Sequence, residues 1–123
     1  MSAEIINLMM TLRDQVKIYH WQTNQFSRHK ATDELVDKLD DNIDKFVEVY
    51  MGKYGRPVFG RSNSAIKIRN FHEKDAPTLL KAYIKWMNTK LSKLVSPTDT
   101  DLLNIRDEIV ADLNQTLYLF TLN

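Results

Sequence analysis

The side chains available to do chemistry in this chain are histidines and carboxylates. The sequence holds three histidines, sixteen acids and no cysteine, which excludes disulfides, thiolate metal sites and a cysteine nucleophile. Nothing in it resembles a Ser-His-Asp set, a phosphate-binding loop or a nucleotide-binding fingerprint. Imidazole nitrogen and carboxylate oxygen are donors that suit iron, manganese or zinc. Metal binding is therefore the chemistry that the residue types favour.

One segment, from His29 to Glu48, concentrates the acids. On a helix with about 100° per residue, four of its side chains share a strip about 100° wide that is separate from the apolar positions: His29, Asp33, Asp44 and Glu48. The count of acids alone favours a simpler interpretation, a charged face in contact with solvent. The full set of acids in the segment is Asp33, Glu34, Asp37, Asp40, Asp41, Asp44 and Glu48.

These four side chains cannot bind one ion within a single chain. Asp33 and Asp44 are 11 residues apart, or about 16 Å along a helix, whereas metal ligands lie within ~2–2.5 Å of the ion. Either the strip is only a charged face, or two copies of the helix pair antiparallel across a two-fold axis. In the second case His29 and Asp33 of one chain meet Asp44 and Glu48 of the other, and symmetry makes two equal sites.

His20 lies across a short turn from His29, with Trp21 beside it. A lone histidine at a helix end is usually there to interact with the helix dipole. Two histidines that flank one turn would instead bring a second imidazole to the same metal ion. By contrast, His72 and Glu73 have no partner at ligand spacing, and we expect them at the surface.

Four amphipathic helices are expected to position these residues. Apolar residues recur at three- and four-residue steps, and the glycines lie in one short stretch that begins at Gly52, which is expected to stop the second helix. Thr98 and Asp101 resemble a capping arrangement for the last helix. The expected helices run from Ser2 to the mid-20s, from about residue 30 to Met51, from Asp75 to about Ser96, and from about Thr98 towards Phe120.

The long connection from Lys53 to Lys74 lets the chain cross the bundle, and residues 65–68 are expected to form one or two helical turns within it. The predicted fold is therefore all-α: residues 1–123 form a single ferritin-like four-helix domain with a long crossover between helices 2 and 3. The net charge of +1 gives no overall field for nucleic acid or membranes. With no signal peptide and no apolar run of ~18 residues, a soluble cytoplasmic protein is expected.

Three short runs of this sequence resemble the ferroxidase signature of the Dps-type miniferritins. In that family a His-Trp pair ends the first helix, and a second His is followed by Asp at +4, Asp at +15 and Glu at +19. The turn between the two histidines is shorter here and lacks a glycine, and the chain lacks a lysine-rich N-terminal extension. The matching runs are residues 17–21, 29–33 and 44–48, and residues 55–60 also match the glycine-proline turn that follows them in the family. The similarity is weaker at residues 99–103.

The resemblance implies a protein that oxidises ferrous iron with peroxide or dioxygen and stores ferric iron in a dodecameric shell, which protects against oxidative stress. Trp21 would either intercept stray radicals beside the site or brace the helix end. Other divalent metals would fit the same donors. The implied iron ligands are His20, His29 and Asp33 of one subunit with Asp44 and Glu48 of its two-fold mate.

The alternative is a structural or DNA-protecting shell protein with little or no ferroxidase activity. DNA binding is the less favoured form of it, because affinity for phosphates depends on basic charge. The basic residues of the crossover are expected to be ordinary surface charge. On the last helix, Asp107, Glu108 and Asp112 either line a pore of the shell or form a solvated face.

Overall fold

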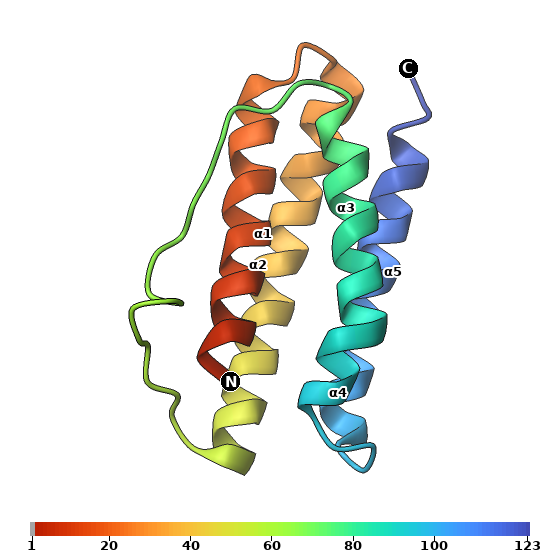
Figure 1. The fold of residues 1–123 in the computed structure, drawn as a ribbon. Helices are drawn as coiled ribbons and strands as arrows, with labels where there is room; N and C mark the ends of the chain where they lie inside the picture. The colour runs from red at the N-terminus through yellow and green to blue at the C-terminus, as the bar shows by residue number, and fades with distance from the viewer. Residues whose placement is uncertain (1) are drawn as a thin grey trace.

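The computed structural model describes residues 2–123, without the side chain of Ser2, and all of its regular structure is helical. The prediction of an all-α four-helix architecture is confirmed (Figure 1). The third helix of the bundle is one continuous helical stretch that includes a π-helical turn, η1. The elements are α1 (Ser2–Gln22), α2 (Phe26–Tyr54), α3 (Asp75–Trp86), η1 (Met87–Leu91), α4 (Ser92–Leu94) and α5 (Thr100–Leu119).

The helices alternate in direction within each half of the bundle. α1 and α2 run antiparallel and are joined by residues 23–25, and the crossover then runs back along the outside of α1 to the start of α3 (Figure 1). α3 descends beside α5, which returns antiparallel to it. α2 packs against both α1 and α5, and α3 packs against α5 and more lightly against α1. The crossover thus ends beside the α1–α2 turn.

The core is a continuous apolar cluster that all of the long helices share. Its members recur at helical spacing, as the sequence predicted, because each helix turns one apolar stripe inwards. The fully buried large side chains are Ile5, Met9, Leu12, Tyr19, Leu35, Leu39, Phe46, Leu80, Met87, Leu91, Leu102 and Ile109.

The second helix extends beyond both of its predicted ends. It begins at Phe26 and continues through Gly52 to Tyr54. Gly55 ends it, with φ of 86° and an amide that donates to the carbonyl oxygen of Met51 at 2.8 Å. Since only glycine adopts this left-handed conformation without strain, Gly55 is the stop. The assignment of that role to Gly52 was wrong.

Two further local predictions were wrong. Residues 65–68 form no helical turn, because the crossover is held instead by side chains of α1: Asn7 Nδ2 donates to the Asn63 and Ala65 carbonyls at 3.1 and 2.8 Å. The predicted cap of the last helix by Thr98 and Asp101 is absent too. Asp99 occupies the N-cap position, and its carboxylate accepts the Ser96 amide at 2.9 Å.

No helix within residues 2–123 is both long enough and apolar enough to span a lipid bilayer.

Candidate metal centre

His20 and His29 form a stacked pair at the α1–α2 turn. Their ring centroids are 3.9 Å apart, and the ring planes differ by 16°. The pair is joined by reciprocal hydrogen bonds, since Nδ1 of His20 lies 2.7 Å from the His29 carbonyl oxygen and Nδ1 of His29 lies 2.8 Å from the His20 carbonyl oxygen. A carbonyl oxygen can only accept, so both Nδ1 atoms carry the proton.

This tautomer leaves Nε2 of each neutral ring with a free lone pair. A ring whose other nitrogen donates to a backbone carbonyl is the usual arrangement of a metal-binding histidine, because that hydrogen bond fixes both the tautomer and the ring orientation. Asp33 Oδ1 lies 4.0 Å from His20 Nε2, on a side chain that is 63% exposed. The structure therefore brings three of the predicted ligands, His20, His29 and Asp33, to one edge of the bundle.

The shortness of the α1–α2 turn explains how the two rings meet. The Thr23 amide still bonds to the Tyr19 carbonyl at 2.8 Å, and the His29 amide already bonds to the Gln25 carbonyl at 2.9 Å. Only residues 23–25 therefore lie between the two helices. The early start of α2 places His29 within its first turns, directly opposite the last turn of α1.

The Thr32 hydroxyl group contacts the histidine pair through His20. Its hydroxyl oxygen lies 3.1 Å from His20 Nδ1 and donates to the Arg28 carbonyl at 2.7 Å. Thr32 and His20 are both buried, at 1% and 5% exposure. Because buried polar groups with satisfied hydrogen bonds hold one geometry, the pair is a rigid feature of the fold.

A second hydrogen-bond network connects the α1–α2 turn to Glu73, near the end of the crossover. Arg28 Nη1 donates to Tyr19 Oη at 2.9 Å and to the Glu73 carbonyl at 2.6 Å, while Tyr19 Oη donates to Glu73 Oε1 at 3.0 Å. The Thr23 hydroxyl also donates to the Glu73 carboxylate, at 2.7 Å. Burial raises the pKa of Tyr19. The expectation that Glu73 is a simple surface residue was wrong, whereas His72 is exposed.

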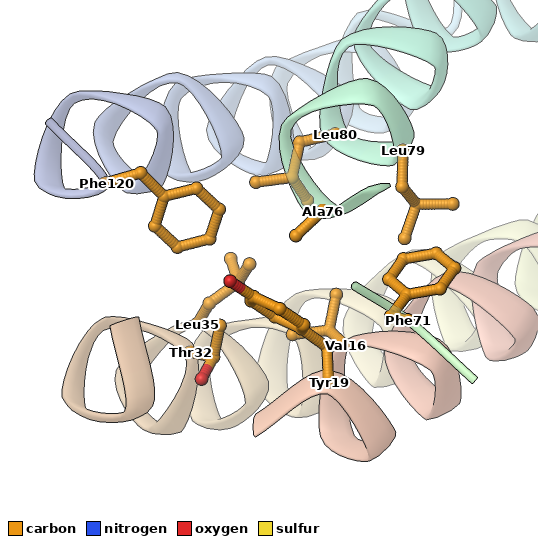
Figure 2. Close-up of a pocket in the computed structure, with 9 residues that line it drawn as sticks. All are labelled: Val16, Tyr19, Thr32, Leu35, Phe71, Ala76, Leu79, Leu80 and Phe120. Atoms are coloured by element: carbon orange, nitrogen blue, oxygen red, sulfur yellow. The ribbon is translucent and has the colours of Figure 1, made fainter. Parts of the chain in front are cut away.

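The interior beneath this network offers no room for a ligand. A cavity of about 10 Å³ lies between the helices (Figure 2), which is at most the space of about one water molecule. Side chains from α1, α2, α3, the crossover and the C-terminal end of α5 converge on it. Its lining is Val16, Tyr19, Thr32, Leu35, Phe71, Ala76, Leu79, Leu80 and Phe120. This cavity therefore does not hold a metal site, and the predicted ligands lie outside its lining, which includes their neighbour Thr32.

The other predicted ligands, Asp44 and Glu48, lie further along α2 and form a second group. Both side chains are exposed. Asp44 raises the pKa of Glu48 through a side-chain hydrogen bond and through the repulsion of its charge. Two carboxylates this close gain from a shared cation, which would remove the repulsion between them.

The predicted ligands thus fall into two separate groups on each chain, which we call the half-sites of the predicted metal site. Within residues 2–123, no three His, Asp or Glu side chains converge closely enough to hold a metal ion. Asp33 and Asp44 belong to one uninterrupted helix, α2, so their separation remains about 16 Å along its axis. A complete site would need the carboxylate group of another molecule.

Exposed aromatic rings flank the histidine pair. The Trp21 side chain is 65% exposed, and its ring centroid lies 6.5 Å from that of His20. Phe26, at 75% exposure, stacks on His29 with the same centroid distance. The sequence offered no reason to select Phe26, because its ring meets His29 only when α2 starts before residue 30. Trp21 and Phe26 thus place exposed aromatic surface beside the histidine pair.

The acids of α5 form no comparable group. Asp107 and Glu108 are exposed, and Asp107 pairs with Arg106 at 2.8 Å. Asp112 accepts a hydrogen bond from Asn42 at 3.1 Å, and burial raises its pKa.

Comparison with known proteins gives a family but no activity. A family model described as a family of unknown function (DUF5856) matches residues 20–120. A protein of Enterobacteria phage T4, described as an uncharacterized 14.6 kDa protein in the mobD-ri intergenic region, is 40% identical over 53 residues. That match covers 43% of this chain and 41% of the phage protein. No solved structure matches the chain.

These matches correct the family resemblance drawn from the sequence. The assignment to the Dps-type miniferritins was wrong, because the model that matches is DUF5856 and neither match is to a ferritin-like or Dps family. The offsets between His29, Asp33, Asp44 and Glu48 are a property of this chain. What they do has to be argued from the geometry of these side chains.

Proposed function

Because the chain belongs to the DUF5856 family, which has no assigned function, we propose from its own side chains that it binds ferrous iron between two copies of itself and oxidises it. The observation that carries this proposal is the reciprocal His20–His29 pair. It presents two imidazole nitrogens with free lone pairs beside Asp33. Asp44 and Glu48 of a second copy would complete the site.

The positions of the two half-sites along α2 agree with a two-fold arrangement. The midpoint between His29 and Glu48 falls between Lys38 and Leu39, and the midpoint between Asp33 and Asp44 falls at the same place. When two copies of one helix pair antiparallel about a two-fold axis at that level, each half-site meets the complementary half-site of the other copy. A single axis would therefore complete both sites at once.

The donor set also favours oxidation of the iron. The two imidazoles would be neutral, while Asp33, Asp44 and Glu48 would bring three negative charges to one ion. Negative oxygen donors stabilise a harder, more highly charged ion, so they favour ferric over ferrous iron and make the electron easier to remove. Iron is the substrate here, and hydrogen peroxide or dioxygen would accept its electrons. Zinc would bind the same donors without this outcome, because Zn²⁺ has no redox chemistry.

Trp21 is placed to act beside such a site. Its ring lies next to His20 and is open to solvent, where an oxidisable indole would meet a radical that leaves the iron. Lys17 Nζ lies 5.1 Å from the indole centroid, a cation–π contact that holds the ring near the helix end. We propose this protective role for Trp21 together with the iron oxidation.

Storage would require a larger assembly than the dimer. The order of two antiparallel helices, a long crossover and two further antiparallel helices is the connectivity of ferritin-like bundles, and we include that topology in the proposal. Twelve copies in a shell would hold ferric iron inside, in the cytoplasm. A shell of the same kind that does not oxidise iron is the alternative function, and it predicts assembly without turnover.

The test is anaerobic titration with ferrous iron, followed by peroxide, with ferric absorbance as the readout. The variant Asp44→Asn/Glu48→Gln should remain folded and lose at least about tenfold in the initial oxidation rate, because two of the ionic ligands are gone. The matched control is Asp107→Asn/Glu108→Gln, an exposed acidic pair on α5, which should oxidise iron at the wild-type rate. An unchanged rate in the first variant would overturn the proposal, and assembly without any oxidation would favour the structural shell.

A further inference from the structure

A groove lies between α1 and α2 and reaches the carboxylate half-site, because Asp44 is part of its lining. It has a volume of 270 Å³, and its lining combines apolar side chains with one ion pair. We call it the α1–α2 groove. Its lining is Ile6, Met10, Arg13, Asp40, Ile43, Asp44 and Val47. Ile6 and Met10 also line a second pocket of 440 Å³, together with the crossover residues Phe59 and Ile66.

The ion pair in the α1–α2 groove joins the two helices. Arg13 Nε donates to Asp40 Oδ1 at 2.8 Å, and Arg13 Nη2 donates to Asp40 Oδ2 at 3.4 Å. This two-point geometry fixes the plane of the guanidinium group. The side chains remain 30% and 49% exposed, so part of the guanidinium group is still open to solvent.

This ion pair lies at the level where a two-fold axis would cross α2. Asp40 is one and a half residues beyond the common midpoint of the half-sites, or about 2 Å along the helix. Asp37 lies equally far on the other side. In an antiparallel pair of chains, Asp37 of one copy is therefore level with Asp40 of the other. Two carboxylates at one level would repel unless a cation lies between them.

Arg13 is the cation in the right place. Lys38, the basic residue nearest to the midpoint on α2, is directed away, since its Nζ donates to Gln115 on α5 at 2.9 Å. Asp14, next to Arg13, lies 3.5 Å from its Nη1 and adds to the acids around this one guanidinium group. A second copy brings its own Arg13 and its own Asp37 to the same level, so each guanidinium group can meet a carboxylate of the other copy.

We propose that Arg13 joins two copies of this chain by binding its own Asp40 and, across the two-fold axis, Asp37 of the second copy, while the apolar walls of the α1–α2 groove pack around this contact. The proposal rests on the two-copy site proposed above and adds the residues that fix its register. An exposed ion pair alone contributes little to stability. When apolar side chains exclude water around the ion pair, its charges favour a partner that places an opposite charge at the same position.

The experiment measures the dimer dissociation constant by analytical ultracentrifugation of the full chain. Arg13→Glu replaces the cation by a third acid beside Asp40 of the same copy and Asp37 of the other copy. The variant should therefore raise the dimer dissociation constant by about a hundredfold or more. The control Lys45→Glu changes the net charge by the same amount on the neighbouring helix α2, at an exposed position outside the strip, and should leave the constant unchanged. Adding Asp37→Lys to Arg13→Glu should restore the dimer, because the new lysine lies level with Asp40 of the other copy.

Three outcomes would overturn the inference: a wild-type chain that stays monomeric, Arg13→Glu that dimerises like the wild type, or a double variant that is not rescued. Circular dichroism of each variant establishes that it is folded, and Arg13→Met provides a milder loss of charge if Arg13→Glu unfolds. The iron proposal fails separately. Glu48→Gln, whose side chain does not line the α1–α2 groove, should dimerise normally while the oxidation rate falls. Oxidation by a monomeric Arg13→Glu variant would contradict the shared iron site but not the proposed Arg13 contact.

Discussion

His20 and His29 each hold the other's backbone: the Nδ1–H of either ring donates to the carbonyl oxygen of the other residue, at 2.7 and 2.8 Å. The two bonds cross the α1–α2 turn and stack the rings 3.9 Å apart. They satisfy two carbonyls near the turn and leave the Nε2 atom of each ring out of these hydrogen bonds. The same contacts that close the turn thus prepare the donors of the proposed metal site.

The tautomer of the pair can be tested directly. Both rings should be in the Nδ1–H form in the metal-free protein near neutral pH, because each Nδ1 faces an oxygen that can only accept. Long-range ¹H–¹⁵N correlation spectra of the imidazole nitrogens distinguish the two tautomers. A spectrum in which either ring carries its proton on Nε2 would remove the free lone pair and, with it, the argument for a metal donor at that ring.

The Tyr19 hydroxyl should contribute measurably to stability. Tyr19→Phe removes a buried group that accepts from Arg28 and donates to Glu73, so each of these partners loses one of its hydrogen bonds. The free energy of unfolding should fall by about 1–3 kcal/mol. Urea denaturation followed by circular dichroism measures the change. The control Tyr118→Phe, at a side chain that is 62% exposed, should stay within about 0.5 kcal/mol of the wild type, and equal losses in both variants would contradict the account of the turn.

Asp99 should make stability depend on acid pH. Hydrogen bonds from Tyr54 and Lys53 and from the Ser96 amide lower its pKa to about 2, from about 4 in an unfolded chain. Because the folded-state pKa is depressed, the stabilisation is complete above pH ~4 and is lost as the pH falls towards ~2. The difference in Tm between wild type and Asp99→Asn should shrink over that range. A difference that stays constant from pH 5 to pH 2 would show that the charge of Asp99 is not the cause.

The shared core predicts a large effect at the centre of α2. Leu39 is fully buried among side chains of the other helices, and Leu39→Ala should lower the free energy of unfolding by about 2–5 kcal/mol through the lost apolar contacts and the cavity left behind. Val58→Ala, at an 87% exposed position in the crossover, should change it by less than about 0.5 kcal/mol. Denaturant titration of both variants gives the comparison, and a small loss at Leu39 would argue against the packing of α2 between α1 and α5.

The helices and the core could be predicted from the sequence because they follow local rules. Apolar spacing identifies buried positions such as Leu39 without knowledge of the partner helix. The end of α2 was predicted at Gly52 because a glycine after an apolar stripe is the usual stop. The structure ends it at Gly55, where the backbone takes a positive φ, and no rule of spacing distinguishes two glycines three residues apart.

The candidate site could be predicted only in part, and the missing part depends on tertiary contacts. The offsets of Asp33, Asp44 and Glu48 from His29 are visible in the sequence. The Tyr19–Glu73 and Arg13–Asp40 contacts join residues 54 and 27 positions apart, and they follow from how the crossover and α2 lie against α1. The same offsets suggested a family that the matches do not support, because four spaced residues constrain a local geometry and not an ancestry.

Complementation between two inactive variants tests the shared iron site most directly. One variant, His20→Ala/His29→Ala, lacks the histidine half-site, and the other, Asp44→Asn/Glu48→Gln, lacks the carboxylate half-site. Each alone should be folded, dimeric and inactive in ferrous oxidation. When the two are mixed and allowed to exchange subunits, half of the dimers at random pairing are mixed, and each mixed dimer has one intact site of two. The rate per chain should then recover to about a quarter of the wild-type rate. A mixture that stays inactive although mixed dimers form, or either variant that is active alone, would contradict a site built from two copies.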